Sequence, residues 1–185
     1  PDVQGALAIL FEQGSSRGHL QETNYGTISF GFTIRNQYLS SIATVEAAVD
    51  NKNLLRDYQK RFFSSSVNEF SSDKTKAYEF GDLYDMNRNK AFIDKLILHN
   101  IKVYRNNEKF IVPVKQQQSR MVKNFFETYD KYVDSVFYDA SAWSVSNFYN
   151  MKSKKLRSFI SGSEITDTDN LIENLKVNKS DYAYI

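Results

Sequence analysis

Strand and helix patterns alternate between residues 76 and 127, and this alternation restricts the possible folds more than any other feature of the sequence. Residues 76–80 and 101–105 carry aromatic and apolar side chains in the pattern of short strands. Between them, from about residue 87 to 99, apolar residues recur one turn apart and predict a helix. A strand, a helix and a strand within about thirty residues predict a βαβ unit with a right-handed crossover. The sequence therefore predicts an α/β fold with a mixed or parallel sheet and flanking helices.

The rest of this half of the chain continues the same pattern. After a turn at Asn106 and Asn107, we expect a strand at residues 109–114 and a helix at residues 118–127. Three weaker segments follow, namely an extended stretch at 134–138, a short helix at 140–149 capped by Asp139 or Ser141, and a loop at 161–181 with a helical turn near 171–175.

One long helix is predicted near residues 36–63. Apolar residues such as Tyr38, Ile42 and Val45 follow one another at spacings of three and four, which places them on one side of a helix. We interpret this stripe as core packing. The polar residues 50–53 interrupt it, and they are the expected position of a kink or of a boundary between two units.

The N-terminal part combines an apolar run with charged and small residues. Residues 6–11 are continuously apolar, which predicts a strand buried on both faces. Glu12 follows this run, and a polar loop with Arg17 and His19 comes next. A carboxylate at the end of a buried strand is partly desolvated, which raises its pKa toward the range useful for general acid/base chemistry. Arg17 could oppose that shift or hold a substrate carboxylate. A plain strand ending in a polar turn is the alternative. Residues 27–32 predict a further short extended piece.

Composition excludes several classes of function. The 24 basic and 22 acidic residues are interspersed and give a net charge of +2, so nothing favours binding to nucleic acid. The strongest basic cluster, at residues 152–157, is expected to be a solvated face. The chain has no cysteine, which removes disulfides, thiolate metal sites and cysteine nucleophiles. No apolar run approaches the ~20 residues of a membrane span, and no signal peptide is present.

No complete catalytic or metal motif occurs in the sequence. The two histidines, His19 and His99, lie far apart without a His-x-x-Glu pattern, and His99 is expected at a helix end. Residues 80–82, Phe-Gly-Asp after a strand, loosely resemble the first turn of a nucleotide-binding unit, but one glycine is little evidence. Three further polar or aromatic residues are interpreted as a cap and a core anchor: Asp134, Asp139 and Trp143.

Residues 6–50 resemble the C-terminal end of the zinc carboxypeptidase (carboxypeptidase A-like) catalytic domain. In that family a late apolar strand delivers the catalytic glutamate, and a Gly-aromatic segment and a final long helix follow. Residues 10–13 are similar to the glutamate strand, 26–32 to the segment after it, and 36–49 to the last helix. Residues 11–19 look closest to a bacterial branch of large multidomain members.

The resemblance continues beyond this part. Residues 76–149, including 137–143, are similar to the region that those multidomain proteins carry after the peptidase. That region leads into a domain like the class I glutamine amidotransferases, and residues 182–185 resemble the start of a further strand in it. The resemblance therefore implies two parts, residues 1–50 from the catalytic domain and residues 51–185 from the following α/β region.

The resemblance implies that Glu12 is the general base that activates a zinc-bound water and then protonates the leaving amine, while Arg17 at most helps to position substrate. The family's zinc ligands lie upstream in the domain and are not in this chain, and His19 matches none of them. We therefore expect a fragment whose parent hydrolyses peptides with zinc, in the periplasm or outside the cell. The chain alone is expected to bind no zinc and to be inactive.

Two other functions stay open. The chain could be a non-catalytic binding or structural module, in which the carboxypeptidase-like part serves only packing. An amidotransferase-like enzyme is disfavoured because that chemistry uses a cysteine nucleophile. Apart from a peptide substrate of the parent, the only partner we expect is a second copy of the chain, through exposed sheet edges.

Overall fold

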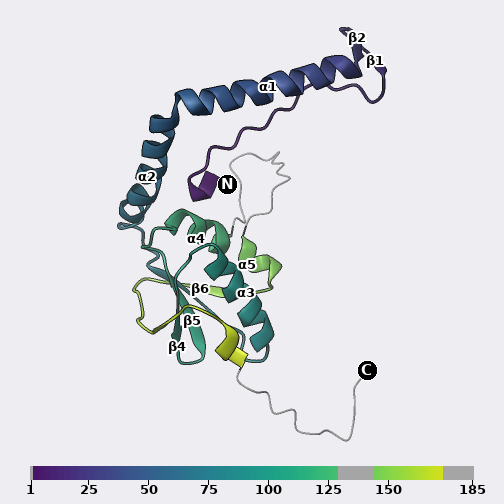
Figure 1. The fold of residues 1–185 in the computed structure, drawn as a ribbon. Coiled ribbons are helices and arrows are strands. Elements are labelled where there is room, and N and C mark those ends of the chain that lie inside the picture. The colour runs from purple at the N-terminus through teal and green to yellow at the C-terminus, as the bar shows by residue number, and fades with distance from the viewer. Residues whose placement is uncertain (1, 129–143, 173–185) are drawn as a thin grey trace, which may run out of the picture. The chain divides into compact units, whose positions relative to one another are not determined.

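The computed structural model describes residues 2–128 and 144–172 (Figure 1). It divides into two compact units, Pro1–Phe62 and Phe63–Ile185, here called unit 1 and unit 2. The α/β class predicted from the sequence is confirmed, because helices accompany one two-stranded and one five-stranded sheet. No helix in the described part of the chain combines the length and apolar character that crossing a membrane requires.

Unit 1 begins with a single helical turn and then a stretch without regular structure. The predicted strand at residues 6–11 is wrong, because these residues are irregular and exposed, with Leu10 80% accessible. A strand buried on both faces needs strands paired on each side of it, and in the described part of unit 1 no strand pairs with this segment. The sheet described in this unit is a hairpin of β1 (Leu20–Thr23) and β2 (Gly26–Ser29), of which β1 lies in the predicted loop.

Helix α1 (Phe30–Asp50) begins at residue 30 and not at about residue 36. Ser29 sets this start, because its hydroxyl accepts a hydrogen bond from the Phe32 N–H at 3.1 Å. The prediction that residues 27–32 are extended therefore holds only as far as the end of β2.

The interruption predicted at residues 50–53 is confirmed. Asn51 separates α1 from α2 (Lys52–Glu69), so the single helix predicted at 36–63 is two helices. The Asn51 side-chain amide donates to the Ala47 carbonyl at 2.9 Å and completes the end of α1.

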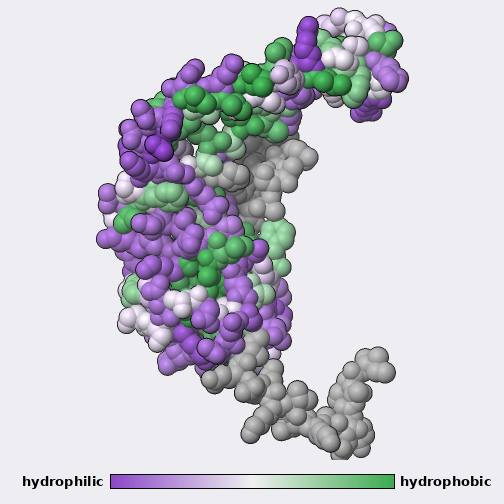
Figure 2. All heavy atoms as spheres, in the orientation of Figure 1, coloured by the Kyte–Doolittle hydropathy of each residue, from purple (hydrophilic) through white to green (hydrophobic). Residues whose placement is uncertain are grey.

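The apolar stripe of α1 is exposed, which corrects its interpretation as core packing. Tyr38, Val45 and Val49 are each more than 60% accessible, and Figure 2 shows hydrophobic residues gathered along this helix. Among residues 2–62 no apolar side chain is buried. The helical period was therefore predicted correctly, but within unit 1 the stripe has no surface against which to pack.

Unit 2 is built on a five-stranded antiparallel sheet of the order β6-β3-β5-β4-β7. Its strands are β3 (Ala77–Phe80), β4 (Val103–Asn106), β5 (Lys109–Pro113), β6 (Ser153–Leu156) and β7 (Ser163–Ile165). Three of these confirm predictions from the sequence, and β6 and β7 were not predicted.

The predicted order of strand, helix and strand at residues 76–105 is confirmed as β3, α3 and β4, but the two strands are not direct neighbours in the sheet. These two strands run parallel, because each pairs antiparallel with β5, which lies between them. The turn at Asn106 and Asn107 folds β5 back beside β4, and Asn107 takes a left-handed conformation with φ of 54°. Neighbouring strands are therefore antiparallel, and the expected parallel pairing does not occur in the described sheet.

The described part of unit 2 also contains the end of α2 and four further helical segments. These four are α3 (Met86–Leu98), α4 (Ser119–Phe126), α5 (Val145–Phe148) and the 3₁₀ turn η2 (Asp169–Ile172). Helices α3 and α4 confirm the predictions at 87–99 and 118–127. The extended stretch predicted at 134–138 and the cap residues Asp139 and Ser141 lie outside the described residues.

The core of unit 2 is aromatic. The Phe80 ring lies 5.1 Å from that of Phe92, 5.5 Å from Phe110 and 5.8 Å from Phe126, measured between centroids. Tyr78 stacks on Phe126 at 4.7 Å. Strand residues 78 and 80 thus meet α3 through Phe92 and α4 through Phe126, so both helices pack on the same face of the sheet.

Strand β6 is an edge of this sheet and carries part of the basic cluster. Lys152, Lys154, Lys155 and Arg157 are exposed, which confirms the prediction of a solvated face. Charged side chains on an edge strand discourage pairing with another chain. Self-association through sheet edges stays a prediction, and these lysines oppose it at β6.

The other edge strand, β7, depends on a glycine. A Cβ atom at Gly162 would overlap the carbonyl oxygen of Arg105 in β4. We expect Gly162→Ala to displace β7 and to lower the free energy of unfolding by about 1–3 kcal/mol. Urea unfolding followed by circular dichroism measures this change. Gly14→Ala is the control because a Cβ there meets nothing within 4 Å, and equal midpoints for the two variants would contradict the prediction.

Candidate functional site

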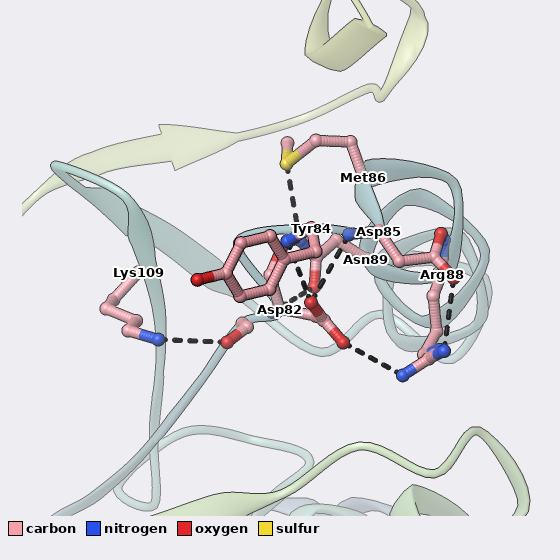
Figure 3. Close-up of polar contacts among 8 residues, drawn as sticks. Asp82, Tyr84, Asp85, Met86, Arg88, Asn89 and Lys109 are labelled. Atoms are coloured by element: carbon pink, nitrogen blue, oxygen red, sulfur yellow. Dashed lines mark hydrogen bonds and ion pairs between the residues drawn. The ribbon is translucent and has the colours of Figure 1, made fainter.

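The best-defined polar arrangement in unit 2 is the β3–α3 loop, residues 81–85, shown in Figure 3. The loop leaves β3 at Gly81, whose φ of 138° is a conformation that other residues rarely adopt. A Cβ atom at this position would also approach the Phe110 side chain to 3.3 Å. A glycine is therefore required where the chain turns away from the sheet.

The Asp82 side chain fixes the loop by hydrogen bonds to its backbone and an ion pair with Arg88. Its Oδ1 accepts hydrogen bonds from the N–H groups of Tyr84 at 2.9 Å and Asp85 at 3.2 Å. Its Oδ2 accepts from the Arg88 guanidinium at 2.9 Å. The hydrogen bond from Tyr84 and the charge of Arg88 together hold the pKa of Asp82 below its ordinary value of 3.8, against a smaller opposing effect of desolvation. Asp82 is therefore ionised and already engaged.

A buried asparagine fixes the same loop from α3. The Asn89 Oδ1 accepts from the Asp82 N–H at 2.8 Å, and its Nδ2 donates to the Asp82 carbonyl at 2.6 Å. Asn89 has no accessible surface, so these bonds satisfy a side chain that would otherwise be costly to bury. The loop conformation is consequently specified by contacts on both of its sides.

Asp85 caps the start of α3, because its carboxylate accepts from the Arg88 N–H at 2.9 Å. The guanidinium of Arg88 returns to the same carboxylate at 3.2 Å. Two aspartates thus share one arginine, and the end of the helix is occupied by the protein's own carboxylate.

A concavity of about 390 Å³ lies beside the loop, lined by residues 81–84, Arg88, Lys109 and residues 150–152. The Lys109 ammonium donates to the Gly81 carbonyl at 2.9 Å (Figure 3). No contact in the described residues joins Lys109 or Lys152 to a carboxylate. The concavity therefore carries two lysine charges beside Asp82, whose lowered pKa owes its smallest named contribution to the charge of Lys109.

Glu12, the catalytic residue expected from the sequence, lies in unit 1 and is exposed. The stretch around it is held against α1 by two hydrogen bonds, from Gln13 Nε2 to the Ser40 hydroxyl at 2.7 Å and from the Ser16 N–H to the Thr33 hydroxyl at 3.1 Å. The expected partial desolvation of Glu12 is not present in this unit, because the strand that would bury it does not form.

Arg17 and His19 follow in the same stretch, and both are exposed. The Arg17 N–H donates to the Gln21 side chain at 2.8 Å, and the His19 carbonyl accepts from the Phe30 N–H at 2.9 Å. These are backbone contacts that shape the entry to β1 and α1. The contacts described for unit 1 do not join Glu12 to either of these side chains.

His99 occupies the predicted helix end, as the C-cap of α3. Burial, with a smaller effect from the charge of Lys95, lowers the pKa of His99 below 6.5. Its ring contacts Phe125 edge-on at 5.5 Å. The lowered pKa favours the neutral imidazole, so packing outweighs the expected attraction of a charged ring to the helix dipole.

Among the described residues, no three His, Cys, Asp or Glu side chains come together in a group that could hold a metal ion. The part of the chain described here therefore does not itself provide a ligand set for zinc. Asp134, Asp139 and Trp143, which the sequence suggested as a cap and a core anchor, lie outside the described residues.

The role of Asn89 was missed, although the sequence contains a signal for it. Asn89 precedes Phe92 and Ile93 by three and four residues, so it falls on the apolar face of α3. A polar residue on a buried face must find partners. Residues 80–82, which loosely resemble the first turn of a nucleotide-binding unit, lie at the start of this loop, but Asn89 was not predicted to be the residue that fixes it.

We compared the chain with protein-family models, with curated proteins and with solved structures, and no match was found in any of the three comparisons.

Proposed function

We propose that residues 1–50 are the closing part of a zinc carboxypeptidase-like catalytic domain, in which Glu12 is the general base of peptide hydrolysis. The resemblance of residues 10–13, 26–32 and 36–49 to that family supports this proposal. The same resemblance supports a location in the periplasm or outside the cell.

The observation that carries the proposal is the exposed apolar surface of unit 1. Large apolar side chains are exposed on the stretch before Glu12, including Leu7, Ile9 and Leu10, and on α1. None is buried in residues 2–62. Apolar side chains that are at most half-buried give a segment of this size little burial free energy to offset the loss of chain entropy. The surface therefore needs a cover, and the remainder of a catalytic domain would bury the stretch before Glu12 as a strand.

In the proposed site the Glu12 carboxylate takes a proton from the water that attacks the peptide carbonyl carbon. It then returns that proton to the nitrogen of the leaving amine. Burial of the preceding apolar stretch would desolvate the carboxylate and improve this exchange. The described residues do not form a zinc site, so no step that involves the metal is assigned to them.

The second candidate is a non-catalytic binding or structural module. It is favoured by the exposed position of Glu12 on a segment without regular structure. Under this alternative the apolar face of α1 would bind another protein surface, and replacing Glu12 would change no activity.

Metal analysis tests the proposal that the zinc ligands lie outside this chain. The isolated 185-residue chain is expected to contain no stoichiometric zinc and to hydrolyse no peptide. Tight binding of one zinc equivalent would overturn the assignment of the metal ligands to other parts of the domain.

Glu12→Gln tests the catalytic role in any longer natural polypeptide that contains this chain and hydrolyses peptides. We expect kcat to fall about 10²–10⁴-fold, as for the loss of a general base, while bound zinc stays unchanged. Glu46→Gln, at an exposed position on α1, is the matched control and should retain activity. Full activity of Glu12→Gln would favour the non-catalytic module.

A further inference from the structure

We propose that the concavity beside the β3–α3 loop of unit 2 binds a small organic anion that carries a flat ring, with its anionic group on Lys109 and Lys152 and its ring against Tyr84. This binding site is independent of the peptidase function proposed for unit 1.

The charge of the concavity favours an anion. Asp82 is the only acidic residue among the described residues that line it, and two backbone N–H groups and Arg88 already engage that carboxylate. Lys109 donates to one backbone carbonyl, so its ammonium has further N–H donors to offer. Lys152 is exposed at the same concavity. Two ammonium groups at one hollow attract a carboxylate or phosphate through charge-assisted hydrogen bonds.

The ring contact comes from Tyr84. This side chain is 98% accessible although it lies on a loop whose backbone is fixed. Figure 3 shows its ring extending from the loop on the side of the Lys109 ammonium. Leu83, beside it on the loop, is 51% accessible and also lines the concavity. An aromatic ring and an aliphatic side chain next to two cations form a surface for a ligand with a flat apolar part and an anionic part.

The loop is held in place before any ligand arrives. Gly81 sets its direction, Asp82 closes its turn, and the buried Asn89 binds both the N–H and the carbonyl of Asp82. Such preorganisation lowers the entropy lost on binding. The volume of about 390 Å³ lies within the range of small-molecule sites, roughly 300–1,000 Å³.

The experiment is a titration of the ¹⁵N-labelled 185-residue chain followed by NMR. Phenyl phosphate and benzoate are the probes that combine a ring with an anion, and inorganic phosphate and benzyl alcohol supply each half alone. We expect the combined probes to shift the amides of residues 81–84 and 150–152, and to bind about tenfold more tightly than either half. The stronger of the two combined probes identifies the anionic group as phosphate or carboxylate.

Variants test the named contacts. Lys109→Gln should weaken the combined probes about tenfold, and Tyr84→Ala should reduce phenyl phosphate to the affinity of inorganic phosphate. Lys115→Gln is the control, because it removes an exposed lysine outside the concavity. The unperturbed amide spectrum of each variant shows that the fold is kept. Equal effects of Lys109→Gln and Lys115→Gln, or shifts scattered over all exposed lysines, would overturn the proposal.

Discussion

Replacing Phe92 with alanine is expected to lower the free energy of unfolding of unit 2 by about 3–5 kcal/mol, the largest effect of any single substitution that we predict. Phe92 has no accessible surface. Its ring makes edge-on contacts with Phe80 at 5.1 Å and Phe126 at 5.6 Å, and it lies 5.2 Å from the Tyr149 ring. The substitution therefore removes the α3 side chain that joins the sheet to α4 and to the segment after α5.

Urea unfolding followed by near-ultraviolet circular dichroism measures this loss, since the signal reports on the packed aromatic side chains. Leu98→Ala is the matched control on the same helix, because Leu98 is 68% accessible and should change stability by less than about 0.5 kcal/mol. Phe92→Leu keeps most of the volume and should fall between the two. Equal midpoints for Phe92→Ala and Leu98→Ala would show that α3 does not pack on the sheet as described.

The same packing explains why most of unit 2 could be predicted from the sequence. Helix α3 shows its buried face directly, with Phe92, Ile93 and Leu96 at spacings of one, three and four. The asparagines at residues 106 and 107 predict the turn between β4 and β5. The order of the strands in the sheet could not be predicted, because the local sequence pattern does not show that β5 lies between β3 and β4. Strand β6 reads as a solvated basic segment, since an edge strand can expose most of its side chains.

Unit 1 was predicted less well, because segments with the sequence pattern of buried elements are exposed in the structure. The apolar residues 6–11 and the stripe of α1 have the composition of buried elements, yet they are exposed. A strand is stable only with neighbours, whereas a long helix satisfies its own backbone hydrogen bonds. This is why α1 and α2 form and the strand before Glu12 does not. For the same reason the site predicted at Glu12 depends on a cover that local sequence cannot supply.

Only part of the candidate site in unit 2 could be predicted from the sequence. Residues 80–82 pointed to the loop, but Lys109 and Lys152 reach it from β5 and from the segment before β6. Residues that meet only through antiparallel pairing carry no local signal of their proximity, because β3 aligns with β5 and β6 across intervening helices and loops.

Lys123 should be the second most sensitive position, and its effect should depend on pH. Its side chain is 12% accessible, and its ammonium lies 2.5 Å from an Asp73 carboxylate oxygen, 3.5 Å from Glu127 and 5.6 Å from the centre of the Phe70 ring. Lys123→Met keeps most of the aliphatic packing but leaves Asp73, whose side chain is 22% accessible, without its cation. We expect a loss of about 2–3 kcal/mol at pH 7, below the 3–5 kcal/mol of fully buried pairs.

The pH dependence follows from the carboxylate. Burial raises the pKa of Asp73, but the hydrogen bonds from Lys123 and from the Thr75 N–H outweigh burial and bring the pKa below its ordinary value of 3.8. A lowered pKa means that the stabilisation is complete above the unfolded value of 3.8 and is lost as the pH falls through the folded value. The stability difference between the wild type and Lys123→Met should therefore be constant from pH 7 to 5 and should shrink below pH 4.

Urea midpoints at pH 7, 5 and 3 test this sign, and Asp73→Asn completes the comparison because it removes the titrating group and keeps the lysine. Burial favours the neutral amine of Lys123, but its hydrogen bond to Asp73 and the nearby negative charges raise its pKa above 10.5, so the ammonium stays charged over the whole tested range. Acid sensitivity thus comes from the carboxylates around Lys123 and not from Lys123 itself. A difference that persists unchanged at pH 3 would mean that Lys123 stabilises unit 2 through the contact of its charge with the Phe70 ring and not through the ion pair.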